Sequence, residues 1–510
     1  MHCERVVRST YFARFYSVYS SKCDKLQVKP FDAIPGPRPS IPFIGTSWQY
    51  FKHLGRYELF KMHEANVDKF RRYGPIVKEE FQWKKPVVIV FEPQDFETIL
   101  RYQGKYPVRP PNEFVCKYRK DNADRYTTVG VSNLLGEEWH KIRRIIAPVL
   151  FKPLVQKCFS SQNKIAEDFT QYLWHIKDND CVIENMIEAT YRQAIESLSM
   201  FCLNSRMGCL STEQLTLDGK KLTAALRNLF DSYQQLYYGL PVWKLLPALS
   251  KAYKQFANAE NDIYDVTEKY VENAFRNFKA KEDQSCDNVL ESLLSLQKLN
   301  ETDIRITTID FMAGGIKTMS TTLAFILYHL STNETVQKRL QQELDNAFKD
   351  TNNLTLEKLD TLSYLKACVK EVFRLSSTIP SIVRILPEKV VLSGYEVPAG
   401  TPIICSFYVT CRLSQFFEDP LQFKPERWLR QHKKEIHPYA MLPFGYGTRQ
   451  CLGKWFSELQ LHIVTANLFY RYNIQSMNTK NLESIQSFII VPKDNIKIKL
   501  SRRQISYDCK

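Results

Sequence analysis

The chain has 510 residues, of which 44% are hydrophobic and 13% aromatic, enough for a large core around a bound ligand. Its 70 basic and 55 acidic residues give a net charge of +15, which favours acidic partners. Nucleic acid is not expected among them, because no zinc-finger spacing, RNA-binding aromatic signature or long basic tract occurs. The 13 cysteines are scattered without a C-x-x-C pair, which predicts a reduced, intracellular protein.

A positively charged segment begins the chain. Its first 22 residues contain Arg5, Arg8 and Arg14, several serines and one acid, Glu4, a composition typical of a mitochondrial presequence. We therefore predict that residues 1–30 direct import into mitochondria; a disordered basic tail is the alternative interpretation. No run of 18 or more apolar residues occurs, so we expect no membrane-spanning anchor.

Residues 31–45 are too rich in proline for a helix or strand and predict a stiff hinge. No linker, repeat or low-complexity tract follows, so residues 46–510 are expected to form a single domain. The pattern is mostly helical from about 137 to 375, with strands predicted at 87–91, within 388–404, and at 488–491 and 496–500. The predicted fold class is mainly α with a small β region.

One loop near the C-terminus carries the strongest signal. Phe444-Gly-Tyr-Gly-Thr-Arg449-Gln-Cys451-Leu-Gly453 places a single cysteine among glycines, before a helix predicted at 454–472. Glycines let the backbone turn tightly and approach a flat ligand, and N–H groups at a helix start stabilise a thiolate. Arg449 is suited to pairing with a carboxylate, and Phe444 to packing on an apolar face.

The spacing Phe-x-x-Gly-x-Arg-x-Cys-x-Gly resembles the haem-ligand signature of the cytochrome P450 family, in which a cysteine thiolate binds the haem iron. A buried cysteine without a special role is the usual alternative, but all five fixed positions match. The resemblance implies a haem-thiolate monooxygenase of that fold. Haem b would lie between a long central helix and the loop, with Cys451 as the axial ligand of the iron.

A long apolar helix is predicted at about 306–330, with Ala313-Gly-Gly-Ile-Lys317-Thr318 near its centre. Two glycines inside a helix cost about 1 kcal/mol each relative to alanine; close helix packing is one explanation and room beside the haem is the other. The resemblance implies a catalytic role for Thr318, as the hydroxyl that delivers protons to dioxygen. The acid that precedes this hydroxyl in the family is replaced by Lys317, which either shuttles protons as a neutral amine or, as we expect, extends its stem to water.

Other cofactor-binding residues follow only from the resemblance. Trp139 and Arg143, spaced as Trp-x-x-x-Arg, match family positions whose side chains bind the haem propionates. Arg384 and Arg449 match two further propionate-binding arginines. Taken singly, each of these arginines would be expected at the surface.

A structural network is also implied. Glu371 and Arg374 stand at i and i+3 of a predicted helix, a spacing that alone indicates a solvated ion pair. Together with Arg427 they match a buried Glu-Arg-Arg network of the family. Its role would be structural, because a fully paired buried network specifies one arrangement.

Lys366 and Lys370 lie on one face of the same predicted helix. Two solvated lysines are the simplest explanation. Their position nevertheless matches the lysines by which mitochondrial members dock a [2Fe–2S] ferredoxin of the adrenodoxin type, which its own reductase reduces. A weak, electrostatically steered contact needs such charges. Trp455 stands where those members usually carry a second arginine.

Several stretches resemble a steroid-hydroxylating mitochondrial member: 106–110, 118–126, 206–208, 237–244, 259–265 and 309–311. They imply a steroid substrate with O2, and a protein on the matrix side of the mitochondrial inner membrane; the endoplasmic reticulum is the less favoured location. The apolar, tyrosine-rich segment 226–248 is expected to touch the membrane peripherally and to roof a substrate channel. A buried helical hairpin is the alternative.

Two other classes of protein remain open. One is a family member that rearranges a peroxide or dehydrates its substrate without external electrons, and would need neither Thr318 nor the docking lysines. The other is a haem sensor without turnover, which Lys317 would fit.

Overall fold

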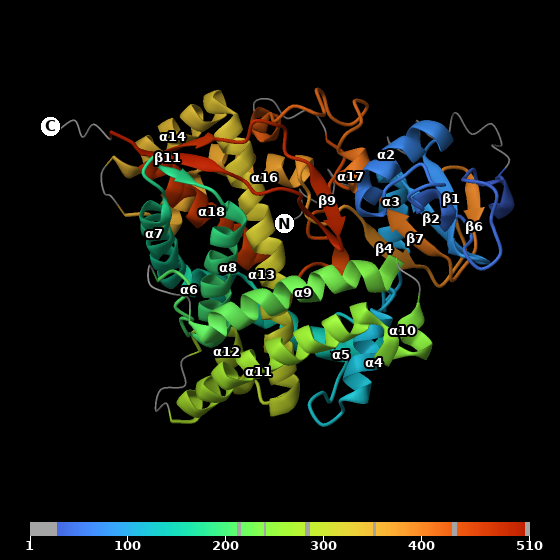
Figure 1. Cartoon of the computed structure of the whole chain (residues 1–510), viewed down its shortest axis with the longest axis horizontal. Helices are drawn as coiled ribbons and strands as arrows, with labels where there is room; N and C mark the ends of the chain where they lie inside the picture. Colours follow the sequence, from blue (N-terminus) through green and yellow to red (C-terminus); the bar gives the residue numbers. More distant parts are fainter. Residues whose placement is uncertain are drawn as a thin grey trace, which may run out of the picture.

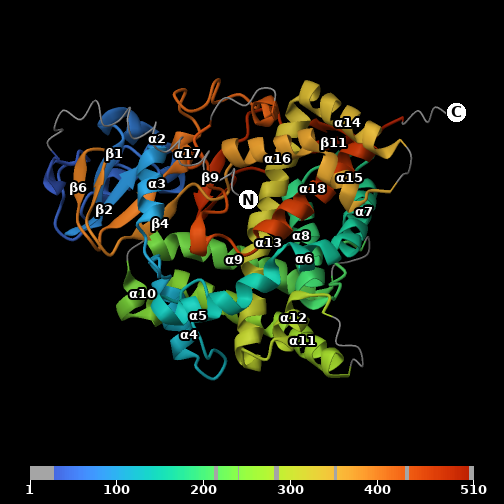
Figure 2. The ribbon, with the colours of Figure 1, turned by 180° about the vertical axis from the view of Figure 1, so that it is seen from behind.

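A computed structural model describes residues 28–211, 216–238, 241–280, 286–349, 353–430 and 436–504. Residues 1–27, most of the expected presequence, lie outside the described residues. A wide helical body adjoins a smaller β-rich region, in which strands from the N-terminal part of the chain meet strands from its last third (Figures 1 and 2). The fold is therefore mainly α with small sheets, as the sequence predicts.

The helices have these bounds: α2 (Met62–Tyr73), α3 (Pro93–Arg101), α4 (Glu113–Asp121), α5 (Gly136–Ile146), α6 (Lys152–Lys157), α7 (Phe159–Ile176), α8 (Met186–Leu203), α9 (Leu217–Tyr238), α10 (Val242–Leu245), α11 (Lys251–Ala280), α12 (Val289–Ser295), α13 (Glu301–Thr332), α14 (Glu334–Phe348), α15 (Leu356–Thr361), α16 (Ser363–Leu375), α17 (Phe407–Thr410) and α18 (Lys454–Arg471). The series from α5 to α16 occupies the stretch predicted to be helical. None of the described helices is long and apolar enough to span a lipid bilayer.

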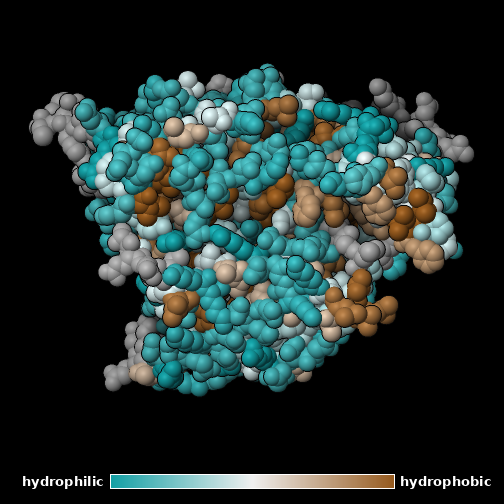
Figure 3. Space-filling model, in the orientation of Figure 1, coloured by the Kyte–Doolittle hydropathy of each residue, from teal (hydrophilic) through white to brown (hydrophobic). Residues whose placement is uncertain are grey.

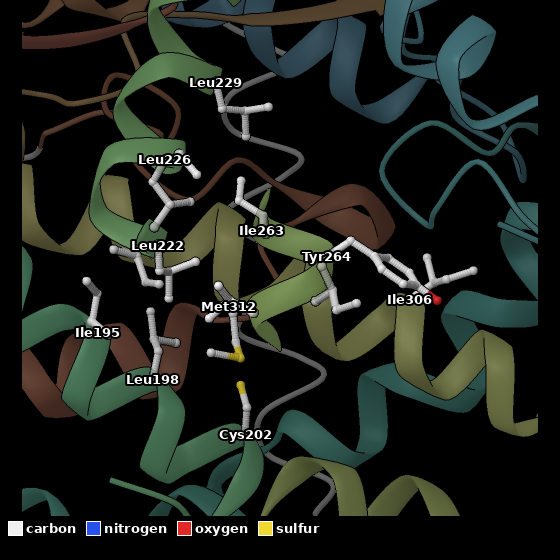
Figure 4. Close-up of a cluster of buried hydrophobic side chains, with 14 of the residues drawn as sticks. Ile195, Leu198, Cys202, Leu222, Leu226, Leu229, Ile263, Tyr264, Ile306 and Met312 are labelled. Carbon is white, nitrogen blue, oxygen red and sulfur yellow. The ribbon is translucent and has the colours of Figure 1, made fainter. Parts of the chain in front are cut away.

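The central helix α13 positions the site. It packs along α8, while α9 packs along α11, and both views show it running through the middle of the helical body (Figures 1 and 2). Buried side chains of these four helices meet in one cluster, with Leu198, Leu226, Ile263 and Met312 as members (Figure 4). Because burying one such side chain stabilises the fold by about 1.5–3 kcal/mol, the cluster holds α13 in place.

The strands are short: β1 (Ile76–Gln82), β2 (Lys85–Val90), β3 (Val182–Ile183), β4 (Ile382–Ile385), β5 (Val390–Leu392), β6 (Tyr395–Val397), β7 (Pro402–Cys405), β8 (Tyr472–Ser476), β9 (Ser484–Ser487), β10 (Ile489–Pro492) and β11 (Ile498–Arg502). The largest sheet has the order β1-β2-β7-β4, with β2 parallel to β7 and Val88 opposite Ile403. The sequence did not predict β1, because Glu79 interrupts its apolar pattern. Glu79 is buried in an ion pair with Lys69, 2.7 Å between Oε2 and Nζ.

The proline-rich segment 31–45 lies against β1. The Lys78 N–H donates to the Pro35 carbonyl at 2.9 Å, and the Thr46 N–H donates to the Glu80 carbonyl at 2.6 Å. Ile34, within the segment, is buried in the core beside the sheet. Because proline has no N–H to donate, Pro35 pairs with the strand through its carbonyl group, and Thr46, directly after the segment, pairs through its N–H. The expected hinge is thus docked on the domain.

Candidate active site

Cys451 lies in a tight loop directly before α18. Gly447 has a φ of 72°, which favours glycine, and a Cβ atom there would stand 2.9 Å from Nε2 of Gln103. The Cys451 N–H donates to the Phe444 carbonyl at 2.8 Å. The Phe444 ring in turn packs edge to face on Phe373 of α16, with ring centroids 5.1 Å apart. The loop is therefore held by contacts on both of its sides.

The sulfur of Cys451 has donors beside it. Burial raises the pKa of the Cys451 thiol, while the backbone N–H groups of Gly453 and Lys454 and the charge of Arg143 act in the opposite direction. Cys451 also keeps accessible surface. Donors, a nearby cation and access together suit a thiolate that binds a metal ion.

The two glycines at the middle of α13 have different surroundings. A Cβ atom on Gly314 would meet nothing within 4 Å, whereas one on Gly315 would stand 2.8 Å from Cδ1 of Leu198 on α8. Gly314 therefore borders open space, and Gly315 permits close packing of α13 on α8. Thr318 lies one turn after Gly314 on the same helix face, and its hydroxyl donates to the Gly314 carbonyl at 3.0 Å.

Lys317 is buried, with 9% of its surface exposed. Its Nζ lies 5.0 Å from the centroid of the Tyr191 ring on α8, a cation–π contact. Burial lowers the pKa of Lys317 to about 8; Asp231 of α9 opposes this shift and Arg227 of α9 adds to it. The expectation that this lysine extends to water is therefore wrong, because α8 and α9 enclose its side chain.

Four arginines from distant parts of the chain converge beside the cysteine loop. They are Arg109, Arg143 of α5, Arg384 of β4 and Arg449. Among the described residues, each guanidinium bonds to backbone carbonyls or an amide and none to a carboxylate. The guanidinium carbon of Arg449 also lies 3.7 Å from the centroid of the Trp139 ring. Arg109 was not predicted from the sequence as a site residue, although it lies in the stretch 106–110 that resembles a steroid-hydroxylating family member.

The gathered charges repel one another. Burial lowers the pKa of Arg449 to about 9, and repulsion by Arg109, Arg384 and Arg143 adds to the shift. Burial likewise lowers the pKa values of Arg143 and Arg384 to about 10. Bringing four cations together costs free energy unless a ligand carries negative charge into the site. The geometry therefore points to an anionic ligand beside Cys451.

The three residues of the expected network meet around Glu371. Arg374 donates to its two oxygens at 2.7 and 2.9 Å, and Arg427 donates at 3.0 Å. The Trp428 indole N–H donates to the same carboxylate at 2.9 Å. Glu371 and Arg374 are fully buried, and the bonds join α16 to the short helix Pro425–Trp428. A buried network with its groups paired holds one arrangement.

Several lysines cluster on a second face of the protein. Burial raises the pKa of Glu458 on α18, against the lowering effect of Lys454, Lys370 and Lys152. The ammonium groups of Lys152 and Lys454 lie 4.9 and 5.1 Å from the ring centroid of Trp455. Trp455 thus lies in a basic environment even though it replaces an expected arginine.

The two predicted docking lysines have different surroundings. Lys370 is exposed and belongs to the basic group just described. Lys366 is tied to Asp360, with its Nζ 2.7 Å from the carbonyl and 3.3 Å from the carboxylate. Sequence reasoning missed Lys152 and Lys454, because only the fold brings α6 and α18 beside α16.

Comparison with known proteins agrees with this geometry. The cytochrome P450 family model matches residues 35–500; the chain belongs to that family. It is 34% identical to the ecdysone 20-monooxygenase of Drosophila melanogaster over 92% of this chain and 88% of the relative. From the same organism, "Probable cytochrome P450 301a1, mitochondrial" is 31% identical (93% and 87% covered) and "Cytochrome P450 302a1, mitochondrial" 28% identical (91% and 94%).

Haem is the cofactor of this family, and the residues present fit it. The macrocycle carries two propionates, and the four guanidiniums lack a carboxylate partner among the described residues. Ala313 of α13 and Leu452 beside Cys451 pack against the same large core cluster, and α18, which begins directly after the loop, contacts α13. Cys451 is the residue that would supply the thiolate that this cofactor needs.

Proposed function

We propose that this protein is a mitochondrial monooxygenase that hydroxylates a steroid, converting ecdysone to 20-hydroxyecdysone. O2 is the co-substrate, and a [2Fe–2S] ferredoxin of the adrenodoxin type with its reductase supplies electrons. The observation that carries the proposal is the 34% identity, along 92% of the chain, to a relative named for that reaction. Mitochondrial relatives at 28–31% identity support the organelle and the kind of electron donor.

The residues of the site have distinct roles in this proposal. Bound haem supplies the chemistry that oxidises a C–H bond with dioxygen. Cys451 would hold its iron, and Arg109, Arg143, Arg384 and Arg449, with the Trp139 indole, its propionates. Phe444 would pack against its face. The hydroxyl of Thr318 would hold a proton beside the open space at Gly314, because both residues share one face of α13.

The basic face around Glu458 supports a ferredoxin contact. Each hydroxylation consumes two electrons and two protons, and the second oxygen atom leaves as water. Electrons must therefore arrive from a separate protein, and Lys152, Lys370 and Lys454 offer the positive rim that steers an acidic carrier. Lys366 contributes less, since Asp360 neutralises its charge.

The face around α10 supports a peripheral contact with the inner membrane on its matrix side. Leu245 and Leu249 are 87% and 72% exposed, and apolar surface gathers near α10 at the lower right of Figure 3. Exposed apolar patches of this kind mark interaction surfaces. Within the predicted segment 226–248, α9 buries Leu226 and Leu229. The α9 part of the segment is thus buried, as in the hairpin alternative, whereas its α10 part is exposed at the surface.

Reconstitution tests the proposal. The purified protein with ferredoxin, its reductase and NADPH should form 20-hydroxyecdysone when offered ecdysone beside cholesterol and vitamin D. Cys451→His should lose the red-shifted Soret band of the ferrous carbon monoxide complex together with activity. Hydroxylation of another steroid alone would contradict the ecdysone assignment. Product formation without ferredoxin would instead identify a rearranging enzyme, and no turnover with any steroid would favour a sensor.

A further inference from the structure

A cluster of buried charged groups lies where α4, α11 and α13 meet. Arg119 of α4 forms a two-point ion pair with Asp310 of α13, with nitrogen–oxygen distances of 2.6 and 3.1 Å. Glu260 of α11 lies 3.5 Å from the same guanidinium and accepts a hydrogen bond from the Tyr126 hydroxyl at 3.4 Å. Three stretches, 118–126, 259–265 and 309–311, that are far apart in the sequence therefore meet at one point.

Burying these charged groups in the protein interior costs free energy. Arg119 and Glu260 are 5% and 7% exposed, and the surrounding core is apolar, with Phe114 and Ile309 among its members. The cost of removing both charges of a buried ion pair from water can exceed the attraction between them. The fold therefore gains little stability from this arrangement, and a role in recognition explains why polar groups stand in an apolar wall.

Asp310 is the member of the cluster that lies closest to the site. It stands one turn before Gly314 on α13, and residues four apart share a helix face. A Cβ atom on Gly314 would meet nothing within 4 Å, so this face borders open space. The Asp310 side chain keeps 17% of its surface exposed, whereas that of Arg119 keeps 6%. The carboxylate thus lies at the edge of this face, with its Oδ2 packed against Gly130, where a Cβ atom would stand 2.1 Å from it.

The carboxylate can also accept a further hydrogen bond. Each of its oxygens has two acceptor positions, and Arg119 occupies one on each. The cluster holds two carboxyl groups and one guanidinium, and burial raises the pKa of Glu260, while Arg119 opposes the shift. Arg119 lies 2.6 and 3.1 Å from the Asp310 oxygens but 3.5 Å from Glu260, so Asp310 is its principal ionic partner.

We propose that the Asp310–Arg119 pair is a specificity-determining site, at which the Asp310 carboxylate accepts a hydrogen bond from a hydroxyl group of the substrate. The inference rests on the proposed function, since it concerns a hydroxylated steroid. A steroid without that hydroxyl leaves a desolvated charged acceptor unpaired, which a site of this kind rejects strongly. The expected discrimination is about 10- to 100-fold, the range for a hydrogen bond to a charged group.

Titration of the holoenzyme tests this site without turnover. The change of haem absorption on steroid binding gives the Kd of ecdysone and of analogues that each lack one hydroxyl, at C2, C14, C22 or C25. Wild type should bind one of these analogues about 10- to 100-fold more weakly than ecdysone. The double variant Arg119→Met/Asp310→Leu replaces the pair with apolar groups of similar size. In this variant the Kd of that one analogue should differ from the Kd of ecdysone by less than threefold. The Kd ratios of the other analogues to ecdysone should stay as they are in wild type.

A matched control exists close by. Arg125 and Asp265 form an exposed ion pair at 3.0 Å, so Arg125→Met/Asp265→Leu should keep the full preference. Asp310→Asn retains an acceptor oxygen and most of the shape but loses the charge, so it should narrow the preference to about 2- to 10-fold, the range for a neutral hydrogen bond, even if the double variant fails to fold.

Two outcomes would contradict the proposed site. In the first, wild type and the double variant rank the analogues in the same way. In the second, the double variant loses affinity for all of the steroids equally, which would identify a purely structural cluster. These outcomes are distinct from failure of the proposed function, which shows as absence of 20-hydroxyecdysone in the reconstituted system.

Discussion

Lys317 is a lysine enclosed by α8 and α9, so its charge links the stability of the protein to pH. Below pH 8 it is protonated in both the folded and the unfolded chain. Its pKa is about 8 when folded, against an ordinary 10.5, so between these values only the unfolded chain binds the proton. The free energy of unfolding therefore rises with pH across this window.

We expect this rise to be about 3 kcal/mol, at 1.36 kcal/mol for each pKa unit. Lys317→Met removes the titrating group, so wild type should gain about that much stability relative to the variant between pH 8 and pH 10.5. Urea denaturation of both proteins at steps of pH measures the difference. Parallel pH profiles for the two proteins would contradict the buried position of the amine.

Thr318 and Lys317 are neighbours in the sequence but face different surroundings. The Thr318 hydroxyl lies on the face of Gly314, whereas the Lys317 ammonium lies over Tyr191. We therefore expect Lys317→Met to keep most of its coupled hydroxylation and Thr318→Ala to release hydrogen peroxide instead of product. Product, peroxide and NADPH consumption are measured together. Loss of hydroxylation in Lys317→Met, with haem and steroid binding intact, would make the lysine a proton relay.

Helix α13 is less stable with glycine at position 314 than it would be with alanine, but the glycine leaves room in the site. Gly314→Ala should raise the free energy of unfolding by about 1 kcal/mol, the difference in helix propensity, while its methyl group enters the open space and weakens steroid binding. Denaturation and steroid titration measure the two effects. Gly315→Ala is the matched control: its Cβ would stand 2.8 Å from Leu198, so the same gain in stability is not expected.

The basic face around Glu458 is formed by residues of α6, α16 and α18. Lys370→Glu/Lys454→Glu should raise the KM for ferredoxin several-fold, because reversing rim charges slows the encounter, and leave steroid affinity unchanged. The effect should shrink as ionic strength rises. Lys366→Glu, at the residue already tied to Asp360, should have a smaller effect. An unchanged ferredoxin titration in the double variant would remove this face from the contact.

For the whole molecule, apolar exposure at α10 and a net charge of +15 together favour an anionic membrane surface. Leu245→Ser/Leu249→Ser should lower sedimentation with anionic phospholipid vesicles several-fold without changing turnover of a soluble steroid. Leu421→Ser, at a leucine that is 75% exposed in a loop between α17 and α18, is the control and should sediment as wild type does. Equal sedimentation of all three proteins would contradict contact through α10.

The family and the mainly helical fold could be predicted from the sequence alone. Loop and helix motifs such as the one around Cys451 depend on residues close together in the chain, so their spacing alone predicts local geometry. Which distant side chains meet could not be predicted and is seen in the folded chain. Folding brought Arg109 to the other arginines, enclosed Lys317 between α8 and α9, and joined Arg119 to Asp310. Such contacts depend on how separate helices pack, and no pattern within one segment encodes them.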